Sequence, residues 1–328
     1  MKFLPACIIW LGCLVWTGAC SKPAHEPVTG PPVYVPDTPA LPVLNGQLVF
    51  HAYTCYTCDD SQVYLFDFTT KQLQCLSEQW EIVNPMNAHF SPDGTKITFM
   101  GKPKGAGDWD VFLYDFKTAG APLNLTHAAH ARDEDPKFSF DGSKIVFKRN
   151  GILTEMDTLG GVLKSYALPH PEASMPYYTG DGNRILYSAR ETGSERADIF
   201  LLSVADGSIR PVAAQPNLEE YYPIVRDDTS FLFTRWRVSG NPNDQVYLGF
   251  FDNRASKRLP FNESDHDFSD AYPVSGRYLV LSSTKAGGKG AYDLYVADLV
   301  SGASWSLSQY KPNLNTARNE LGACYREK

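Results

Sequence analysis

The sequence predicts an all-β protein, a six-bladed β-propeller with four antiparallel strands in each blade. Two repeated patterns lead to this prediction. Two apolar runs joined by an Asp-Gly turn recur along the chain, as in HFSPDGTKITFMG (His89–Gly101) and KFSFDGSKIVFKR (Lys137–Arg149). A further apolar run, in most repeats ending in a polar turn, follows each pair, as in DVFLYD (Asp110–Asp115). Four β-forming segments in each unit of roughly 40–50 residues are typical of a propeller blade.

The polar turns define the period of the repeat. Asp-Gly between alternating apolar residues is a strong hairpin signal, because glycine accepts the positive φ of a tight turn. No long segment shows an apolar period of about 3.6 residues, so few helices are expected. The turn positions are spaced 40 to 48 residues apart and are Gly46, Gly94, Gly142, Gly182, Asp228 and Gly276.

The first turn has no strand before it. One further period beyond Gly276 ends in NELGACYREK (Asn319–Lys328), at the C-terminus. We therefore predict that this segment supplies the innermost strand of the first blade, beside the strand that begins near Gly46. Such a closure leaves no open strand edge between the first and last blades.

Residues 1–19 have the features of a signal peptide, with Lys2 before an apolar run and small residues before Cys20. The end of this segment resembles a bacterial lipobox. The resemblance implies lipidation of Cys20 and anchoring in the outer membrane, with the domain facing the periplasm or the cell surface. Ordinary cleavage near Ala19, without a lipid, is the alternative.

Two further segments follow the predicted signal peptide. Residues 20–44 contain seven prolines and predict an extended tether. Residues 45–328 hold the repeats and therefore the propeller. An even number of cysteines in this exported domain suggests disulfides, whose pairing stays open among three arrangements. In some of these pairings a disulfide would clamp the closing blade, and in others a disulfide would close a local loop. The cysteines are Cys55, Cys58, Cys75 and Cys324.

The repeat units NPMNAHFSPDGTKITF and DWDVFLYD, with Asn124-Leu125-Thr126 after them, resemble the TolB-like (WD-like) β-propeller repeat of bacterial envelope proteins. The resemblance covers about residues 45–328 and is strongest at Ser91–Gly94. It implies the propeller fold, and it implies little about activity because propellers host many functions.

Charge and missing motifs argue against several functions. The formal net charge of −7 makes nucleic-acid binding improbable. The sequence has no Gly-x-Ser-x-Gly elbow, phosphate-binding loop or dinucleotide fingerprint. Asp59 follows the C-x-x-C motif where haem attachment requires His.

The segments that enter the blades are expected to share the face opposite to the Asp-Gly turns, and so to form one set around a channel mouth. Four of them end on a proline, and the residue three positions before that proline is Asp133, Ala173, Glu220 or Asp270. We expect Asp133, Glu220 and Asp270 to line one mouth of the channel and to bind a partner. The polar counterparts in the other two segments are Asn84 or Asn87 and Asn319.

Histidines on the same segments predict a candidate divalent-cation site, formed by His130, His170 and His266 beside the carboxylates. Polar residues that bond the local backbone are the alternative. The sequence Arg235-Trp236-Arg237 lies on a loop of the same face. Arginine binds carboxylate or phosphate in bidentate fashion, and tryptophan offers a stacking surface. Solvated charge with a packed tryptophan is the alternative for this loop.

Two functions are consistent with these patterns. The first is a non-catalytic envelope lipoprotein, expected to be monomeric, which binds an envelope protein or polysaccharide through the loop face and touches the membrane only through its lipid. The second is a metal-dependent oligouronide lyase, similar to the oligogalacturonate lyases, in which Asp133 and the three histidines bind the cation. In that alternative, Arg235 or Arg237 binds the sugar acid.

Overall fold

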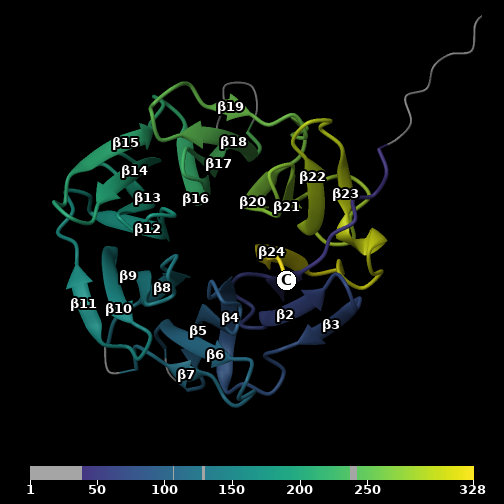
Figure 1. Ribbon diagram of the computed structural model, residues 1–328, viewed down its shortest axis with the longest axis horizontal. Helices are drawn as coiled ribbons and strands as arrows, with labels where there is room; N and C mark the ends of the chain where they lie inside the picture. Colours follow the sequence, from purple (N-terminus) through teal and green to yellow (C-terminus); the bar gives the residue numbers. More distant parts are fainter. Residues whose placement is uncertain (1–38, 106, 128–129, 237–241) are drawn as a thin grey trace, which may run out of the picture. The chain divides into compact units, whose positions relative to one another are not determined.

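Six four-stranded antiparallel sheets form a ring around a central channel (Figure 1). The computed structural model describes residues 39–328, apart from residues 106, 128–129 and 237–241. In blades 2 to 6 the chain runs from the channel outward, so the first strand of each blade lies innermost. The predicted propeller of four-stranded antiparallel blades is confirmed.

The strands of each blade are given from the channel outward. Blade 1 contains β24 (Asn319–Arg326), β1 (Gln47–Tyr53), β2 (Gln62–Asp67) and β3 (Gln72–Cys75). Blade 2 contains β4 (Ile82–Phe90), β5 (Lys96–Pro103), β6 (Asp110–Asp115) and β7 (Leu123–Asn124). Blade 3 contains β8 (Asp133–Phe138), β9 (Lys144–Arg149), β10 (Ile152–Asp157) and β11 (Val162–Ser165).

The other three blades follow the same order. Blade 4 contains β12 (Glu172–Tyr178), β13 (Arg184–Arg190), β14 (Ala197–Ser203) and β15 (Ile209–Ala213). Blade 5 contains β16 (Glu219–Asp227), β17 (Ser230–Trp236), β18 (Gln245–Phe250) and β19 (Lys257–Arg258). Blade 6 contains β20 (Phe268–Pro273), β21 (Tyr278–Ser283), β22 (Asp293–Asp298) and β23 (Ser304–Ser306), after which comes a short 3-10 helix, η1 (Leu307–Gln309).

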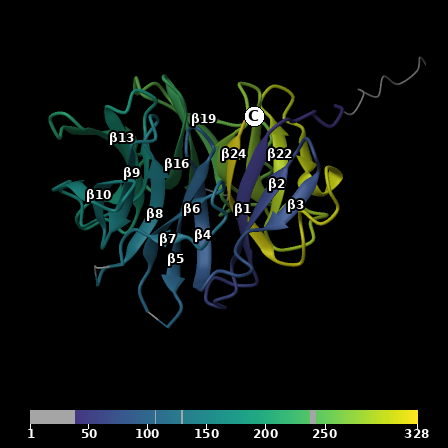
Figure 2. The ribbon, with the colours of Figure 1, turned by 60° about the horizontal axis from the view of Figure 1, so that its bottom comes forward.

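The C-terminal strand closes the ring, as the sequence predicts. β24 lies beside β1 (Figure 2) and pairs with it antiparallel. In this pairing, Cys324 is opposite Val49. The seam between the last and first blades is also filled with apolar side chains. Leu48 and Phe50 of β1 share one buried cluster with Val280 of β21. Strand pairing and apolar packing therefore both hold the two ends of the chain together.

The Ser-Pro-Asp-Gly turn of blade 2 shows why the repeat uses these residues. The hydroxyl of Ser91 donates to Asp93 Oδ1 (2.6 Å), and the backbone N–H of Thr95 donates to the same oxygen (3.0 Å). These hydrogen bonds hold the pKa of Asp93 well below its usual range. Gly94 has a φ of 65°, a conformation that glycine adopts readily. The same hydroxyl-to-aspartate bond recurs in blade 3, so these aspartates stabilise turns.

The cysteines form one local disulfide, between Cys55 and Cys58 in the β1–β2 loop. Cys75 and Cys324 are free thiols. The disulfide that we considered as a clamp on the closing blade is therefore not formed. The Cys324 thiol is buried beside the channel.

Residues 39–44, at the end of the predicted tether, lie against blade 6. The indole N–H of Trp305 donates to the carbonyl oxygen of Pro39 (3.1 Å), and the hydroxyl of Tyr310 donates to that of Pro42 (2.6 Å). The predicted signal peptide and Cys20 lie outside the described residues. Within the described part of the chain, no helix is long and apolar enough to cross a membrane.

Candidate functional site

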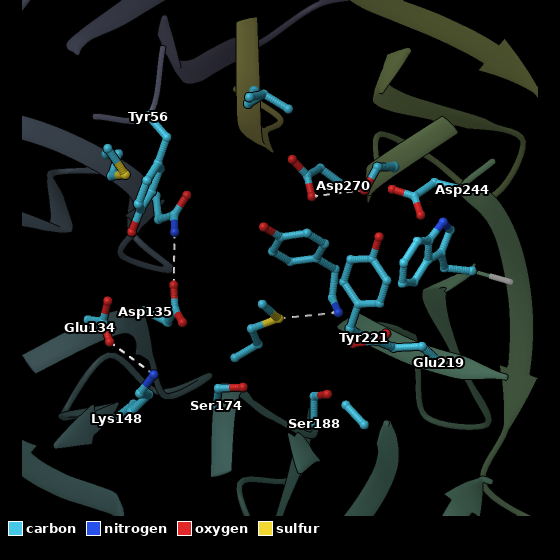
Figure 3. Close-up of a pocket in the computed structure, with 18 of the residues that line it drawn as sticks. Tyr56, Glu134, Asp135, Lys148, Ser174, Ser188, Glu219, Tyr221, Asp244 and Asp270 are labelled. Carbon is cyan, nitrogen blue, oxygen red and sulfur yellow. Dashed lines mark hydrogen bonds and ion pairs between the residues drawn. The ribbon is translucent and has the colours of Figure 1, made fainter. Parts of the chain in front are cut away.

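A cavity of about 800 Å³ opens at one mouth of the channel. It lies on the face where the chain enters each blade, opposite to the Asp-Gly turns. Residues of all six blades line it (Figure 3). One lining residue from each blade, in order, is Tyr53, Asn87, Asp135, Met175, Tyr222 and Asp270.

The innermost strand of each blade carries a β-bulge at the bottom of this cavity. The register shifts, for example, between Glu134 and Lys137 in β8 and between Ser269 and Tyr272 in β20. One residue at each shift has a positive φ of 47° to 60°. Such a bulge re-aims the side chain that it carries, here toward the channel. The six residues are Asn87, Asp135, Met175, Tyr222, Asp270 and Gly322.

A chamber of about 60 Å³ continues the channel below this ring of bulges. The hydroxyl of Tyr177 lies 3.2 Å from Nε2 of His89 and 3.2 Å from the hydroxyl of Tyr272. Burial holds the pKa of His89 well below its usual value, so this ring is neutral at pH 7. Lys137 also lines this chamber, and burial lowers the pKa of its ammonium group.

The three predicted carboxylates have different positions. Asp133 is fully buried and accepts two hydrogen bonds of 2.8 Å from the guanidinium of Arg149. Glu220 is also fully buried and accepts hydrogen bonds from Nε (2.8 Å) and Nη2 (2.5 Å) of Arg235. Of the three, Asp270 alone lines the cavity. Asp133 and Glu220 lie between strands in ion pairs, because the bulge two residues further on turns a different side chain to the channel.

The asparagine counterparts also differ. Asn87 lines the cavity, and its side-chain amide donates to Asp135 Oδ1 (2.8 Å). Asn84 instead donates to Asp59 Oδ1 (2.6 Å). Asn319 donates to the carbonyl oxygen of Thr54 (3.1 Å), at the start of the β1–β2 loop.

The Arg-Trp-Arg segment is split by the end of β17. The guanidinium of Arg235 is buried, lies 4.2 Å from the ring centroid of Tyr247 and pairs with Glu220. Trp236 lines the cavity. Arg237 lies outside the described residues. In the described segment, Trp236 is therefore the residue that lines the cavity.

The three histidines have separate neighbours. His130 is exposed. His170 Nδ1 lies 3.1 Å from the hydroxyl of Tyr187, and its ring packs on Phe200. His266 lies near two acids, and these three form the one group of potential metal ligands found among the described residues. The group consists of Glu263, Asp265 and His266.

The two sides of the cavity differ in charge (Figure 3). On the side of blades 3 and 4, Lys148 lies 3.0 Å from Glu134 and 3.1 Å from Glu172, so these acids are paired. The other side is formed by blades 5 and 6 and bears four carboxylates. No lysine or arginine among the described residues forms an ion pair with them. We call this side the acidic wall, which consists of Glu219, Asp244, Asp267 and Asp270.

Burial and nearby negative charge disfavour ionisation of two acids of the wall, Asp244 and Asp270. Burial raises the pKa of Asp244 to about 7, and the charges of Asp267, Asp270 and Glu219 act in the same direction, whereas a hydrogen bond from Tyr221 opposes them. Burial also raises the pKa of Asp270 to about 6, against a hydrogen bond from the backbone of Gly322. Perturbed acids gathered in one cavity are a feature of functional sites.

The variant Asp244→Asn is expected to stabilise the protein at pH 8. The unfolded-state pKa of aspartate is about 3.9, so the native state holds the proton more tightly. The proton on Asp244 therefore stabilises the native state fully below about pH 4, and this stabilisation is lost as the pH rises through 7. We expect a gain of about 1–3 kcal/mol at pH 8 that shrinks below about 1 kcal/mol at pH 4, measured by urea unfolding.

The matched control is Asp206→Asn, because hydrogen bonds from Ser203 and Ser208 lower the pKa of this exposed aspartate. It should give no gain at pH 8. Equal gains for Asp244→Asn at both pH values would contradict the prediction. Asp198 and Glu320, whose pKa values burial raises to about 7, affect wild type and variant alike and cancel in the difference.

Of the four acids of the wall, only Asp270 is among the site residues predicted from the sequence. A usable signal was present in the types of residue at the bulges. Asn87, Asp135, Asp270 and Gly322 are all residues that tolerate a positive φ, and they recur at roughly the spacing of the turns. Alignment on these residues, instead of on the prolines, would have placed Asp135 and Asp270 together.

Aromatic side chains complete the cavity. Tyr56, at the tip of the disulfide-bonded loop, stacks on Trp109 with ring centroids 6.4 Å apart. Around the acidic wall lie Tyr221, Tyr222 and Trp236, and Tyr292 lies beside Asp267. A site that combines tyrosine, tryptophan and carboxylates suits recognition of a partner with mixed apolar and positive character.

Comparison of the sequence finds no matching family model and no matching curated protein. Solved structures are similar at low sequence identity. TolB from Acinetobacter baumannii is 16% identical, with a TM-score of 0.65 over 86% of this chain and 67% of that chain. Hydrazine synthase from Kuenenia stuttgartiensis is 16% identical, with a TM-score of 0.67 over 86% of this chain and 46% of that chain.

A third similar structure is the β-propeller domain of the Trilobed protease from Pyrococcus furiosus. It is 15% identical, with a TM-score of 0.53 over 80% of each chain. The chain spans less than half the length of the hydrazine synthase chain and four fifths of the protease domain. At these identities the similarity concerns the fold, and the chain has a TolB-like six-bladed propeller fold.

Proposed function

We propose that this protein is a non-catalytic binding protein of the bacterial envelope, anchored through Cys20, which holds part of a protein or polysaccharide partner in the cavity. The main support is the cavity itself, an open site of about 800 Å³ lined by aromatic and carboxylate side chains from all six blades. Sites of this size are large enough to enclose several residues or sugar units of a partner.

The arrangement of polar groups also supports binding. His51 lines the cavity, but burial lowers its pKa to about 3 and its Nδ1 accepts the backbone N–H of Asn87 (3.4 Å). The hydroxyl of Ser188 donates to the carbonyl oxygen of Glu220. These two groups are committed to the backbone, and a nucleophile with an adjacent base requires a different arrangement.

The acidic wall favours this proposal over the oligouronide lyase. A uronate carboxylate that enters the cavity would meet four carboxylates on that wall and would be repelled. Arg235, which the lyase hypothesis assigned to the sugar acid, is buried in its pair with Glu220.

Photo-crosslinking in the native host tests the proposal. The full chain would carry p-benzoylphenylalanine at Tyr56, which lines the cavity, or at Val162, which is exposed on β11 of the outer rim. We expect an adduct from the Tyr56 position, identified as protein or glycan by mass spectrometry, and none from the Val162 position. Trp236→Ala should weaken the adduct. Adducts from Val162 without adducts from Tyr56 would contradict the proposal.

A further inference from the structure

Among the described residues, no lysine or arginine forms an ion pair with the acidic wall. Glu134 and Glu172, on the opposite side, share Lys148. The negative charges of the other three acids of the wall, together with burial, disfavour ionisation of Asp244. A ligand that brings positive charge would relieve this repulsion.

Asp270 is the centre of the unbalanced charge. It is 8% exposed and points into the cavity (Figure 3). Its hydrogen bonds, from Ser269 Oγ and from the Gly322 N–H, are both long, at 3.4 Å. A buried carboxylate without short hydrogen bonds or a paired cation is unfavourable, so the fold maintains this group at the expense of stability.

The charged groups that act on Asp270 leave a negative excess, and the phenols of Tyr221 and Tyr292, whose pKa values burial raises, add no charge at pH 7. The charge of Lys137, in the chamber below, attracts Asp270, whereas the charge of Asp135 repels it. Tyr53 and Tyr222 also face Asp270, and burial raises the pKa of both phenols, so they are neutral at pH 7. One lysine therefore faces two aspartates here, before Asp244, Asp267 and Glu219 are considered.

The spacing of the acidic wall suits a large cation. No three of its carboxylates approach closely enough to share a metal ion, since the one such group among the described residues is at Glu263. A guanidinium or an alkylammonium can span wider oxygen positions through several N–H donors. The tyrosine and tryptophan rings beside the wall add the surface that such cations prefer.

We infer that the acidic wall binds the side chain of an arginine or lysine presented by a basic segment of the partner protein. This inference rests on the proposed function and commits it to a protein partner. The carboxylates of blades 5 and 6 bind the cation, and Tyr221, Tyr222 and Trp236 contact its alkyl chain and flanking residues. The paired side of the cavity, around Lys148, receives the uncharged part of the segment.

Small probes test the inference directly. The probes are N-acetyl-arginine amide and its citrulline counterpart, which has nearly the same shape without the charge. Binding to the full-length mature protein is measured at pH 8 by ligand-observed NMR. We expect the arginine probe to bind at least about tenfold more tightly than the citrulline probe, as one or two charge-assisted hydrogen bonds would produce.

Two variants locate the effect. Asp244→Asn combined with Asp270→Asn should remove the preference for arginine, whereas Asp206→Asn, at an exposed turn outside the cavity, should preserve it. Lowering the pH from 8 to 5 should reduce the preference in the wild type, because Asp244 and Asp270 take up protons over this range. Circular dichroism of each variant confirms that it is folded.

The outcomes are distinct from those of the crosslinking experiment. Failure of the wild type to bind the arginine probe, equal binding of both probes, or an unchanged preference in the double variant would each overturn the inference. An adduct at Tyr56 together with any of these results would leave the cavity as the partner site and exclude a cationic ligand. A glycan adduct would overturn the commitment to a protein partner.

Discussion

Ending the chain at Arg318 is expected to abolish the folded ring. The truncation removes β24, so β1 loses its inner neighbour along the register from Gln47 to Tyr53. It also removes Ala323 and Tyr325 from the apolar cluster at the seam of blades 6 and 1. Loss of a whole strand from a closed sheet leaves an open edge and exposes the core. We expect this loss to exceed a typical stability of about 5–15 kcal/mol.

Gel filtration, near-ultraviolet circular dichroism and limited proteolysis measure this outcome. The truncated protein should be aggregated or rapidly digested, without the near-ultraviolet signal of packed tyrosines. The control ends at Arg326 and removes only Glu327 and Lys328. Lys328 forms a partly exposed ion pair with Asp67, so we expect its loss to change stability by about 1 kcal/mol or less. A cooperative unfolding transition in the Arg318 truncation would contradict closure by β24.

Replacing Arg235 with Met is expected to lower the free energy of unfolding by about 3–5 kcal/mol at pH 7, because it leaves a buried carboxylate unpaired. Glu220 is fully buried, and its short hydrogen bonds come from Arg235 Nε and Nη2. The guanidinium also donates to Ser256 Oγ (3.0 Å). Because Met keeps much of the side-chain volume of Arg, the lower free energy of unfolding would reflect the missing charge and not a cavity.

The pH dependence of this variant separates charge from packing. Burial raises the pKa of Glu220 even beside Arg235, and removal of the arginine should raise it further. The loss should therefore shrink as the pH falls and Glu220 binds a proton. Because the unfolded-state pKa of glutamate is about 4.3, the native state then holds this proton more tightly, and stability recovers as the pH falls.

The double variant Glu220→Leu with Arg235→Met should recover most of the lost stability, since replacement of a buried ion pair by apolar residues is often neutral or stabilising. Arg254→Met, at an exposed pair with Asp252, is the surface control and should change stability by about 1 kcal/mol or less. If the double variant were no more stable than Arg235→Met, the ion pair would not explain the loss. Weakened partner binding by Arg235 variants must be judged against this instability.

The sequence by itself determined the architecture, because its signals are local and repeated. The turn at Ser91–Gly94 contains its own hydrogen bonds and its positive φ, so a short segment specifies each hairpin. Repetition of this turn fixed the period, and the period placed Asn319–Lys328 at the position of the missing strand. The pairing of β24 with β1 then followed from the need to close the ring.

The site was decided by the tertiary structure. Side chains alternate along a strand, and a bulge reverses which of them face the channel. In β8, the proline Pro136 directly follows the bulge at Asp135, whereas in β20 the proline Pro273 lies three residues beyond the bulge at Asp270. Two acids at the same distance from their prolines, Asp133 and Asp270, therefore have opposite positions. Asp133 entered an ion pair with Arg149, while Asp270 entered the cavity. The charge balance of the cavity also depends on neighbouring strands and blades. The folded ring was therefore needed to show that no described lysine or arginine forms an ion pair with the acidic wall.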